Sequence, residues 1–220
     1  MLSDTAILIP SYNSNERLSR LIKQIKGQYS NHIIVVDDGS FVPIELEHKD
    51  ISLIQNESNM GKGISLKRGF DFARQKGFSH AVTMDSDLQH DPKELPRFLD
   101  SKSDLDFVLG YRERSASMPI SRKFSNGITS LIISKLIGVK IKDSQCGYRR
   151  YSLEAINNIK FLEAGFQFES EVLIKGVSAH SKLEQVKIST IYDKDNKSYI
   201  KHFSDTLKFI RLILRSIFKK

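Results

Sequence analysis

Short apolar segments alternate with longer amphipathic ones over the first half of this 220-residue chain, with no hairpin signal between them. Apolar and β-branched runs predict strands at residues 6–10, 32–36, 51–55, 78–84 and 105–110. Apolar residues at helical spacing predict helices at 16–28, 64–76 and 95–101. This alternation predicts an α/β fold with a mostly parallel, Rossmann-like sheet flanked by helices. In such sheets, ligands bind beyond the carboxyl ends of the strands.

Polar residues follow each predicted strand. They are Tyr12 and Asn13, Asp37 and Asp38, Lys62, Asp85 and Asp87, and Arg112. Because the carboxyl ends of parallel strands share one edge, we expect these side chains to form a nucleotide site. Plainer interpretations exist: residues 37–40 (Asp-Asp-Gly-Ser) also suit an ordinary turn. Residues 61–63 (Gly-Lys-Gly) lack the Walker spacing, which counts against an ATPase or kinase of the P-loop type.

Three potential oxygen ligands, Asp85, Asp87 and Gln89, stand at every second position after the fourth predicted strand. Extended backbone would send all three side chains to the same side, so we expect them to converge. Two carboxylates and an amide oxygen suit Mg²⁺ or Mn²⁺ bound to a substrate's phosphates. The alternative is a polar loop that leads into a helix, with Asp91 as its N-cap and Pro92 in its first turn.

Composition bounds the class of protein. The single cysteine, Cys146, excludes an internal disulfide and fits a reducing compartment. No apolar run approaches the ~20 residues that cross a bilayer, and we expect a cytoplasmic protein. The net charge of +8 is concentrated in residues 194–220, where eight Lys or Arg residues face two Asp residues. Such a tail suits an anionic membrane or nucleic acid, but no nucleic-acid recognition motif is present, so we expect no nucleic-acid partner.

The tail also has helical spacing. Apolar residues recur at Phe203, Leu207, Ile210, Leu214 and Ile217, and basic residues at Lys208, Arg211, Arg215 and Lys219. This pattern predicts a basic amphipathic helix suited to an anionic membrane surface. The alternative is a helix that packs on the protein's own sheet or in a homodimer.

Six ordered segments carry a resemblance to a known family. They are IPSYN (9–13) with Glu16, VVDDGS (35–40), NMGKG (59–63), MDSDLQH (84–90), DSQCGYR (143–149) and GFQFESE (165–171). In this order they resemble the motifs of family 2 glycosyltransferases, which have the GT-A nucleotide-diphospho-sugar transferase fold. The dolichyl-phosphate and polyprenyl-phosphate hexose synthases are the most similar branch. The resemblance covers residues 5–205, and we expect a catalytic domain at 1–203 followed by the basic helix at 204–220.

The resemblance implies roles for individual residues. The nucleotide-sugar donor would be bound by Pro10, Tyr12, Glu16, Asp38, Lys62, Asp85 and Ser86. Asp85, Asp87 and Gln89 would hold the metal ion. Asp87, Arg112 and Arg122 would be catalytic, the two arginines facing the acceptor phosphate, although Lys123 could take the place of Arg122. Glu169 or Glu171 would face the acceptor, Phe166 and Phe168 would belong to the core, and Cys146, where the family usually has serine, would be a packing residue.

The implied activity is metal-dependent, inverting transfer of a hexose from GDP-mannose or UDP-glucose to a polyprenyl or dolichyl phosphate at the cytoplasmic face of a membrane. A phosphate acceptor is already ionised and needs no general base, and we find no convincing Glu-Asp base motif. The chain has no tryptophan and therefore lacks the QxxRW segment of processive polysaccharide synthases. Two alternatives remain: transfer to a sugar hydroxyl in cell-envelope polysaccharide or glycolipid synthesis, and a non-catalytic nucleotide-sugar-binding protein.

Overall fold

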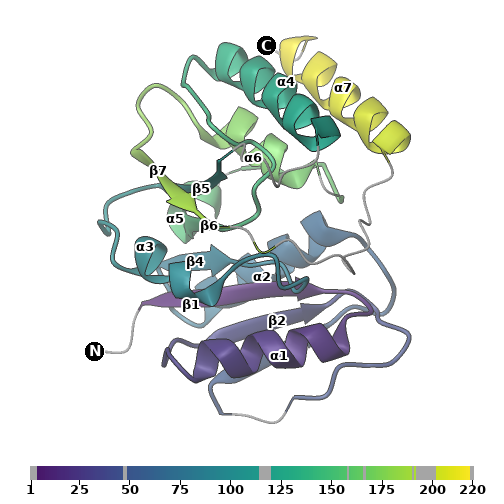
Figure 1. The fold of residues 1–220 in the computed structure, drawn as a ribbon, viewed down its shortest axis with the longest axis vertical. Helices are drawn as coiled ribbons and strands as arrows, with labels where there is room; N and C mark the ends of the chain where they lie inside the picture. Colours follow the sequence, from purple (N-terminus) through teal and green to yellow (C-terminus); the bar gives the residue numbers. More distant parts are fainter. Residues whose placement is uncertain are drawn as a thin grey trace.

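The computed structural model describes residues 4–46, 49–113, 120–157, 159–165, 167–189, 191 and 202–218. Its described residues form a seven-stranded sheet in the order β3-β2-β1-β4-β6-β5-β7 (Figure 1). The strands are β1 (Thr5–Ser11), β2 (Ile33–Asp37), β3 (Ile51–Gln55), β4 (His80–Thr83), β5 (Phe107–Arg112), β6 (Arg149–Ser152) and β7 (Leu183–Ile188).

The sheet is mostly parallel, as predicted. β1 pairs in parallel with β2 and β4, β2 with β3, and β5 with β7. Strand β6 is the exception, because it lies between β4 and β5 and runs antiparallel to both. The start of β6 therefore lies at the edge where the parallel strands end.

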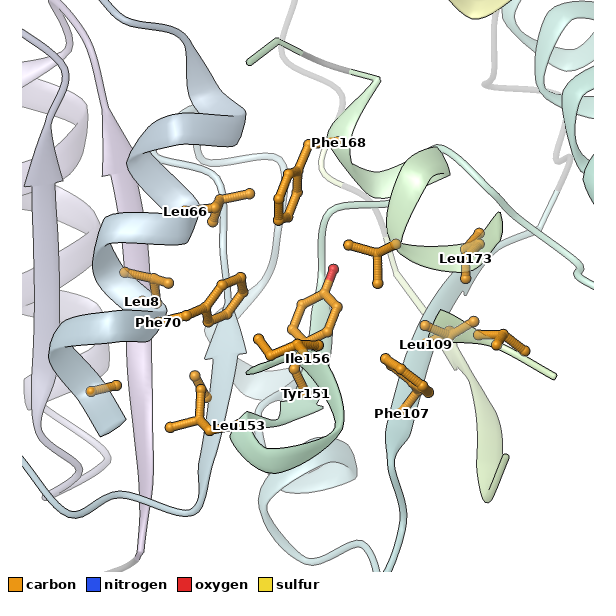
Figure 2. Packing of buried hydrophobic residues seen from close by; sticks show 14 of the residues in the cluster. Leu8, Leu66, Phe70, Phe107, Leu109, Tyr151, Leu153, Ile156, Phe168 and Leu173 are labelled. Carbon is orange, nitrogen blue, oxygen red and sulfur yellow. The ribbon is translucent and has the colours of Figure 1, made fainter. Parts of the chain in front are cut away.

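Helices cover both faces of the sheet. They are α1 (Asn15–Lys26), α2 (Lys62–Gln75), α3 (Pro96–Leu99), α4 (Ile120–Ile137), α5 (Leu153–Asn157), α6 (Phe168–Gly176) and α7 (His202–Phe218), with a 3₁₀ turn η1 at Pro92–Glu94. Alternate residues of the strands face opposite cores, as pleated backbone requires. In β1, Ile7 and Ile9 pack with α1 and α3, whereas Ala6 and Leu8 pack with α2, α5 and α6 (Figure 2).

Several boundaries differ from the sequence prediction. Helix α2 begins at Lys62 rather than at residue 64. The predicted helix at 95–101 is reduced to the four-residue α3, which the 3₁₀ turn η1 precedes. The predicted N-cap is confirmed, since Asp91 Oδ1 accepts a hydrogen bond of 3.0 Å from the backbone N–H of Lys93. Arg112 and Asp37 were expected in loops, but each is the last residue of its strand.

Helix α7 forms where the tail pattern predicted it, but three residues of its predicted apolar face are about half exposed, and the side chains of the other two, Phe203 and Ile217, lie outside the described residues. Leu207, Ile210 and Leu214 are 53%, 47% and 49% exposed. The helix docks instead through buried Leu212, with Phe209 partly buried against the core. No helix among the described residues is long and apolar enough to span a bilayer.

Candidate active site at the carboxyl edge of the sheet

The segment after β4 folds back on itself instead of continuing as a strand. Leu88 has a φ of +64°, and the backbone N–H of Gln89 donates to Asp87 Oδ1 at 3.0 Å. The backbone N–H of Asp85 donates to Nδ1 of buried His90 at 3.1 Å, which closes the turn. The expected extended backbone is therefore wrong here, because the carboxylate of Asp87 and the ring of His90 satisfy backbone N–H groups within a turn.

Lys62, the first residue of α2, joins this turn to α6. Its Nζ lies 2.5 Å from Asp85 Oδ1 and 2.6 Å from Glu169 Oε1. A Cβ on Gly147, just before β6, would lie 2.9 Å from Asp85 Oδ2 and 3.0 Å from Lys62 Nζ. Glycine at 147 therefore leaves room for the ion pair in this position, and a larger residue would make the side chains of Asp85 and Lys62 shift.

The charges of this cluster perturb one another. Burial opposes the charge of Lys62, but Asp85 and Glu169 outweigh it and raise the pKa of the ammonium above its ordinary value. Burial also opposes the charge of Asp85, but Lys62 outweighs it, so the pKa of this carboxyl is lowered. For Asp87, burial and then the charge of Asp85 raise the pKa, whereas burial lowers the pKa of His90. The carboxylates of Asp85 and Asp87 therefore interact electrostatically.

Side chains of the β1 loop connect to the same turn. The hydroxyls of Ser11, Ser14 and Ser86 form a chain with Oγ–Oγ distances of 2.8 Å, so the hydroxyl of buried Ser86 has a hydrogen-bond partner. The ring of Tyr12 lies beside that of Phe41, with their centroids 6.1 Å apart and tilted by 56°. Phe41 is 86% exposed. Sequence reasoning missed Phe41, although an apolar aromatic directly after Asp-Asp-Gly-Ser is itself a visible signal.

The carboxylate of Asp38 stabilises the neighbouring loop through hydrogen bonds to its backbone. Its Oδ1 accepts from the backbone N–H of Met60 at 3.0 Å and its Oδ2 from that of Gly61 at 2.8 Å. Asp37 similarly accepts from the backbone N–H groups of residues 40 and 44. The bond from Ser40 to Asp37 supports the plainer interpretation of an ordinary turn, whereas Asp38 holds a different loop, and its contact with a nucleotide stays a prediction.

Two residues predicted for the donor, Pro10 and Glu16, and the predicted metal ligand Gln89 are placed less centrally. Pro10 lies near the end of β1 and is partly exposed. The Glu16 side chain is 80% exposed and forms an ion pair with Arg20 on the same helix. Gln89 accepts a hydrogen bond at its carbonyl from the backbone N–H of Ile191.

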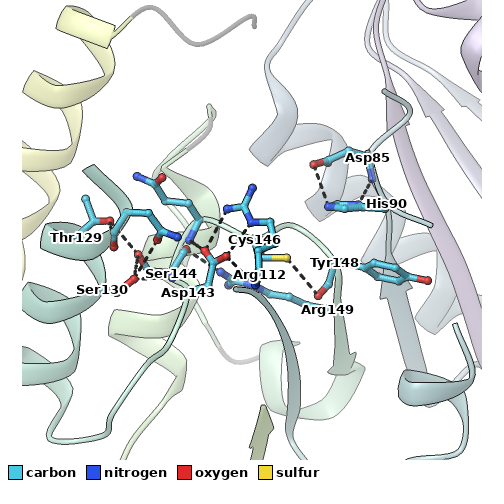
Figure 3. Close-up of polar contacts among 12 residues, drawn as sticks. Asp85, His90, Arg112, Thr129, Ser130, Asp143, Ser144, Cys146, Tyr148 and Arg149 are labelled. Carbon is cyan, nitrogen blue, oxygen red and sulfur yellow. Dashed lines mark hydrogen bonds and ion pairs between the residues drawn. The ribbon is translucent and has the colours of Figure 1, made fainter. Parts of the chain in front are cut away.

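Arg112, at the end of β5, forms a two-pronged ion pair with Asp143. Its Nε and Nη2 donate to Oδ2 and Oδ1 of Asp143 at 2.8 and 3.2 Å (Figure 3). Although Asp143 is buried, Arg112 outweighs burial and lowers the pKa of the carboxyl. The next residue, Ser144, bonds to Ser130 on α4. Arg122 lies on α4 but its side chain is outside the described residues, as is Phe166.

Arg149 fixes the segment that precedes β6. It is fully buried, and its Nε, Nη1 and Nη2 donate to the backbone carbonyls of Cys146, Glu169 and Ser144 at 2.7, 2.9 and 2.8 Å. Cys146 is buried, and burial raises the pKa of its thiol to about 11, which supports a packing role.

The two glutamates of α6 have different surroundings. Glu171 accepts from the backbone N–H groups of Leu162 and Glu163 and pairs with Lys175 at 2.5 Å. Glu169 instead reaches Lys62 and so points toward the turn after β4. Of the two candidates, Glu169 contacts Lys62 and Glu171 holds the preceding loop, and the expected role of either toward the acceptor stays a prediction. Phe168 is in the core, as predicted.

Comparisons with known proteins agree on one family. The model of the family described as "Glycosyl transferase family 2" matches residues 6–159. The polyprenol monophosphomannose synthase of Mycolicibacterium smegmatis is 28% identical over 202 residues, covering 84% of this chain and 76% of that protein. The UDP-N-acetylglucosamine–dolichyl-phosphate N-acetylglucosaminyltransferase of Methanococcus voltae is 28% identical over 216 residues, covering 84% and 85%.

The fold has solved counterparts. Glucosyl-3-phosphoglycerate synthase from Mycobacterium tuberculosis, crystallised with Mn²⁺, UDP-glucose and phosphoglyceric acid, superposes with a TM-score of 0.70 at 17% identity. The match covers 96% of this chain and 79% of that one. The predicted GT-A fold is confirmed.

Proposed function

The chain belongs to glycosyl transferase family 2 and is a glycosyltransferase, and from this premise we propose that it moves a hexose from a nucleotide-diphosphate sugar to a polyprenyl or dolichyl phosphate. One observation carries the proposal. The names of its two relatives give different sugars, mannose and N-acetylglucosamine, but both name a phosphorylated polyprenol or dolichol. The acceptor class is therefore the shared property, and GDP-mannose and UDP-glucose both remain candidate donors.

The turn after β4 fits a divalent cation bound jointly with the donor. Asp85 and Asp87 are close enough for the charge of one to raise the pKa of the other, so a cation between them would relieve repulsion. Among the described residues, no group of three or more His, Cys, Asp or Glu side chains could hold a metal. The protein would thus supply few ligands, which suits Mg²⁺ or Mn²⁺ completed by diphosphate oxygens and water. The role of Gln89 as a third ligand stays a prediction, because the turn at Leu88 removes the extended backbone on which it rested. When bound, the cation would neutralise the departing nucleoside diphosphate.

The remaining donor contacts would come from the loops beside this turn. Tyr12 and the exposed ring of Phe41 provide aromatic surfaces for a base, and Lys62 provides an ammonium for the diphosphate. Asp38 would act by holding the loop at Met60 and Gly61, and Ser86 by tying this loop cluster to Asp85. Pro10 would border the base pocket, whereas Glu16 would reach it only by leaving its ion pair with Arg20.

The acceptor would approach from the β5 and α4 side. Its phosphate oxygen attacks the anomeric carbon as the bond from that carbon to the diphosphate breaks, which inverts the configuration. No base is needed, since the attacking oxygen is already ionised. Arg112 and Arg122 would hold the phosphate, and Asp143 would orient the guanidinium of Arg112.

A membrane surface would bring the lipid acceptor to this site. Helices α4 and α7 lie side by side in Figure 1. Both expose apolar side chains. On α4 these are Phe124, Ile128, Leu131 and Ile132, and on α7 they are Leu207, Ile210 and Leu214. Residues 114–142 contain six Lys or Arg and no Asp or Glu. Exposed apolar residues with basic neighbours suit an anionic bilayer, which supports the peripheral location.

The test combines a binding assay with a transfer assay. We expect Asp87→Ala to abolish transfer and the Mn²⁺-dependent part of GDP or UDP binding while the thermal melting temperature stays near that of the wild type. Asp71→Ala, which removes an exposed carboxylate on α2, is the control and should leave both unchanged. Radiolabelled sugar should appear on polyprenyl phosphate. Label on a sugar hydroxyl instead, with none on the lipid, would overturn the acceptor assignment and leave the family assignment intact.

The membrane part has its own test. Leu131→Glu and Ile210→Glu place a charge on the exposed faces of α4 and α7, and both should release the protein from anionic liposomes without changing nucleotide binding. Neutral liposomes and high salt are the controls, because salt screens the basic contribution. Undiminished binding of both variants to anionic liposomes would show that these faces do not contact the bilayer.

A further inference from the structure

Lys62 occupies a position for which a cation would compete. Its ammonium lies 2.5 Å from Asp85 Oδ1, and the side chains of Lys62 and Asp85 are 15% and 29% exposed. Asp85 is one of the two carboxylates proposed to hold the divalent cation. Two positive groups on one carboxylate oxygen repel each other, and in this partly buried setting water screens the repulsion only in part. A cation that binds Asp85 therefore competes with Lys62 for this carboxylate.

Glu169 is the second anchor of the same ammonium. Its Oε1 lies 2.6 Å from Lys62 Nζ, and its side chain is 6% exposed. Its Oε2 is buried and accepts no hydrogen bond from the described residues, so the carboxylate retains capacity for another N–H. When Lys62 leaves Asp85, Glu169 can accept from the ammonium through either oxygen.

The backbone on both sides of Lys62 is fixed. The N–H of Gly63 donates to the carbonyl of Ala164 at 2.7 Å, and a Cβ on Gly61 would lie 2.4 Å from that same oxygen. The start of α2 is thus packed against the segment that leads into α6, which carries Glu169. A change of partner by Lys62 requires a new side-chain rotamer and no movement of the helix.

We propose that Glu169 is a positioning residue that retains Lys62 in the site when a divalent cation takes Asp85, so that Lys62 exchanges Asp85 for the diphosphate of the donor. This inference rests on the proposed function. It makes cation and donor binding mutually favourable, since diphosphate draws Lys62 from Asp85 and the cation leaves Lys62 available for diphosphate. Such coupling is reciprocal by linkage.

The experiment titrates Mn²⁺ by electron paramagnetic resonance, without nucleotide and then with GDP or UDP. Lys62→Met should tighten Mn²⁺ binding without nucleotide by about tenfold, because it removes a competing charge. The same variant should weaken nucleotide binding in the presence of Mn²⁺. Lys62→Gln carries the same expectation and replaces it if Lys62→Met does not fold. The control is Lys67→Met on the exposed side of α2, which should change neither affinity.

Glu169→Gln tests the positioning role. It should weaken Mn²⁺ binding without nucleotide, because Lys62 then pairs with Asp85 alone. In the Lys62→Met background, this effect should shrink at least threefold. A residue with only a structural role would have the same effect in both backgrounds, so equal effects would overturn the role of Glu169.

The outcomes separate this inference from the proposed function. If the wild-type protein binds neither Mn²⁺ nor GDP nor UDP, the proposed function fails. If it binds Mn²⁺ and a nucleotide, but Lys62→Met leaves Mn²⁺ affinity unchanged or lowers it, only the exchange of Lys62 is wrong.

Discussion

The pair between Arg112 and Asp143 allows a prediction in which stability and catalysis are separated. In Arg112→Met, the side chain keeps its apolar stem and loses both hydrogen bonds to Asp143. The Asp143 side chain has no exposed surface, and that of Arg112 is 16% exposed. Removing one partner of a buried ion pair costs about 3–5 kcal/mol. Because Arg112 retains some solvent contact, we expect the lower end, about 3 kcal/mol, or ~6–12 °C in melting temperature for a chain of this size.

The stability lost in Arg112→Met should depend on pH, in a direction set by the pKa of Asp143. Burial opposes the charge of Asp143, but Arg112 outweighs it and depresses the pKa of Asp143 in the folded wild type. The ion pair therefore contributes its full stabilisation at pH values above the pKa of Asp143 in the unfolded chain, ~3.9. This stabilisation is lost as pH falls through the lower pKa of Asp143 in the folded protein. Without Arg112, burial raises the folded pKa, so the folded variant takes up a proton more readily than its unfolded chain. The difference in melting temperature should thus be largest at pH 8 and smaller at pH 5.

Differential scanning fluorimetry across that pH range is the assay, with Arg112→Met/Asp143→Asn as the companion variant. Neutralising both partners should recover part of the lost stability, since no unpaired charge remains. If the recovered double variant binds donor but does not transfer sugar to lipid phosphate, Arg112 also contacts the acceptor. A single variant that melts within 2 °C of the wild type, or a difference that stays constant with pH, would refute the reasoning.

Two further predictions concern residues that touch the donor side of the site. Gly147→Ala places a Cβ 2.9 Å from Asp85 Oδ2 and 3.0 Å from Lys62 Nζ. We expect transfer to fall at least tenfold while the circular dichroism spectrum stays native. Full activity would show that the ion pair can shift without loss of function. Phe41→Ala should raise the Kd for GDP or UDP about fivefold, the lower end for loss of base stacking on an exposed ring, without changing binding of pyrophosphate with Mn²⁺. Val42→Ala, also exposed, is its control in calorimetry, and an equal loss for pyrophosphate would exclude stacking.

The features that sequence predicted are those set by local pattern. The strands up to β5 are short apolar runs, and parallel pairing brings their polar carboxyl ends to one edge whatever the details of the loops. Strand β6 was missed because it begins with two arginines. Arg149 is tolerated in the core only because three backbone carbonyls, one of them 20 residues away, accept its N–H groups. Nothing in the sequence around Arg149 indicates which carbonyls accept its N–H groups.

The turn after β4 shows a different limit. Alternate spacing of Asp85, Asp87 and Gln89 implied convergence only if the backbone were extended. The positive φ of Leu88 interrupts the extended backbone. Leucine rarely adopts a positive φ, so the sequence gives no indication of this turn. Glu169 and Glu171 likewise share the first turn of one helix and could not be told apart by sequence. They are separated by their partners, which are Lys62 on another helix for Glu169 and the backbone of Leu162 and Glu163 for Glu171.

The antiparallel strand β6 explains how two halves of the site are held together. β1, β2 and β4 with their loops contribute Tyr12, Asp38 and Asp85, whereas β5 contributes Arg112. Because β6 enters the sheet between β4 and β5 in the opposite direction, the segment just before it crosses the carboxyl edge between these groups. That segment places Gly147 against Asp85 and Asp143 against Arg112. Arg149 holds the segment by donating hydrogen bonds to its backbone carbonyls. A parallel strand at this position would begin at the far edge and could set neither contact. The distance between the proposed donor and acceptor groups is therefore determined by a segment that itself carries no proposed catalytic residue.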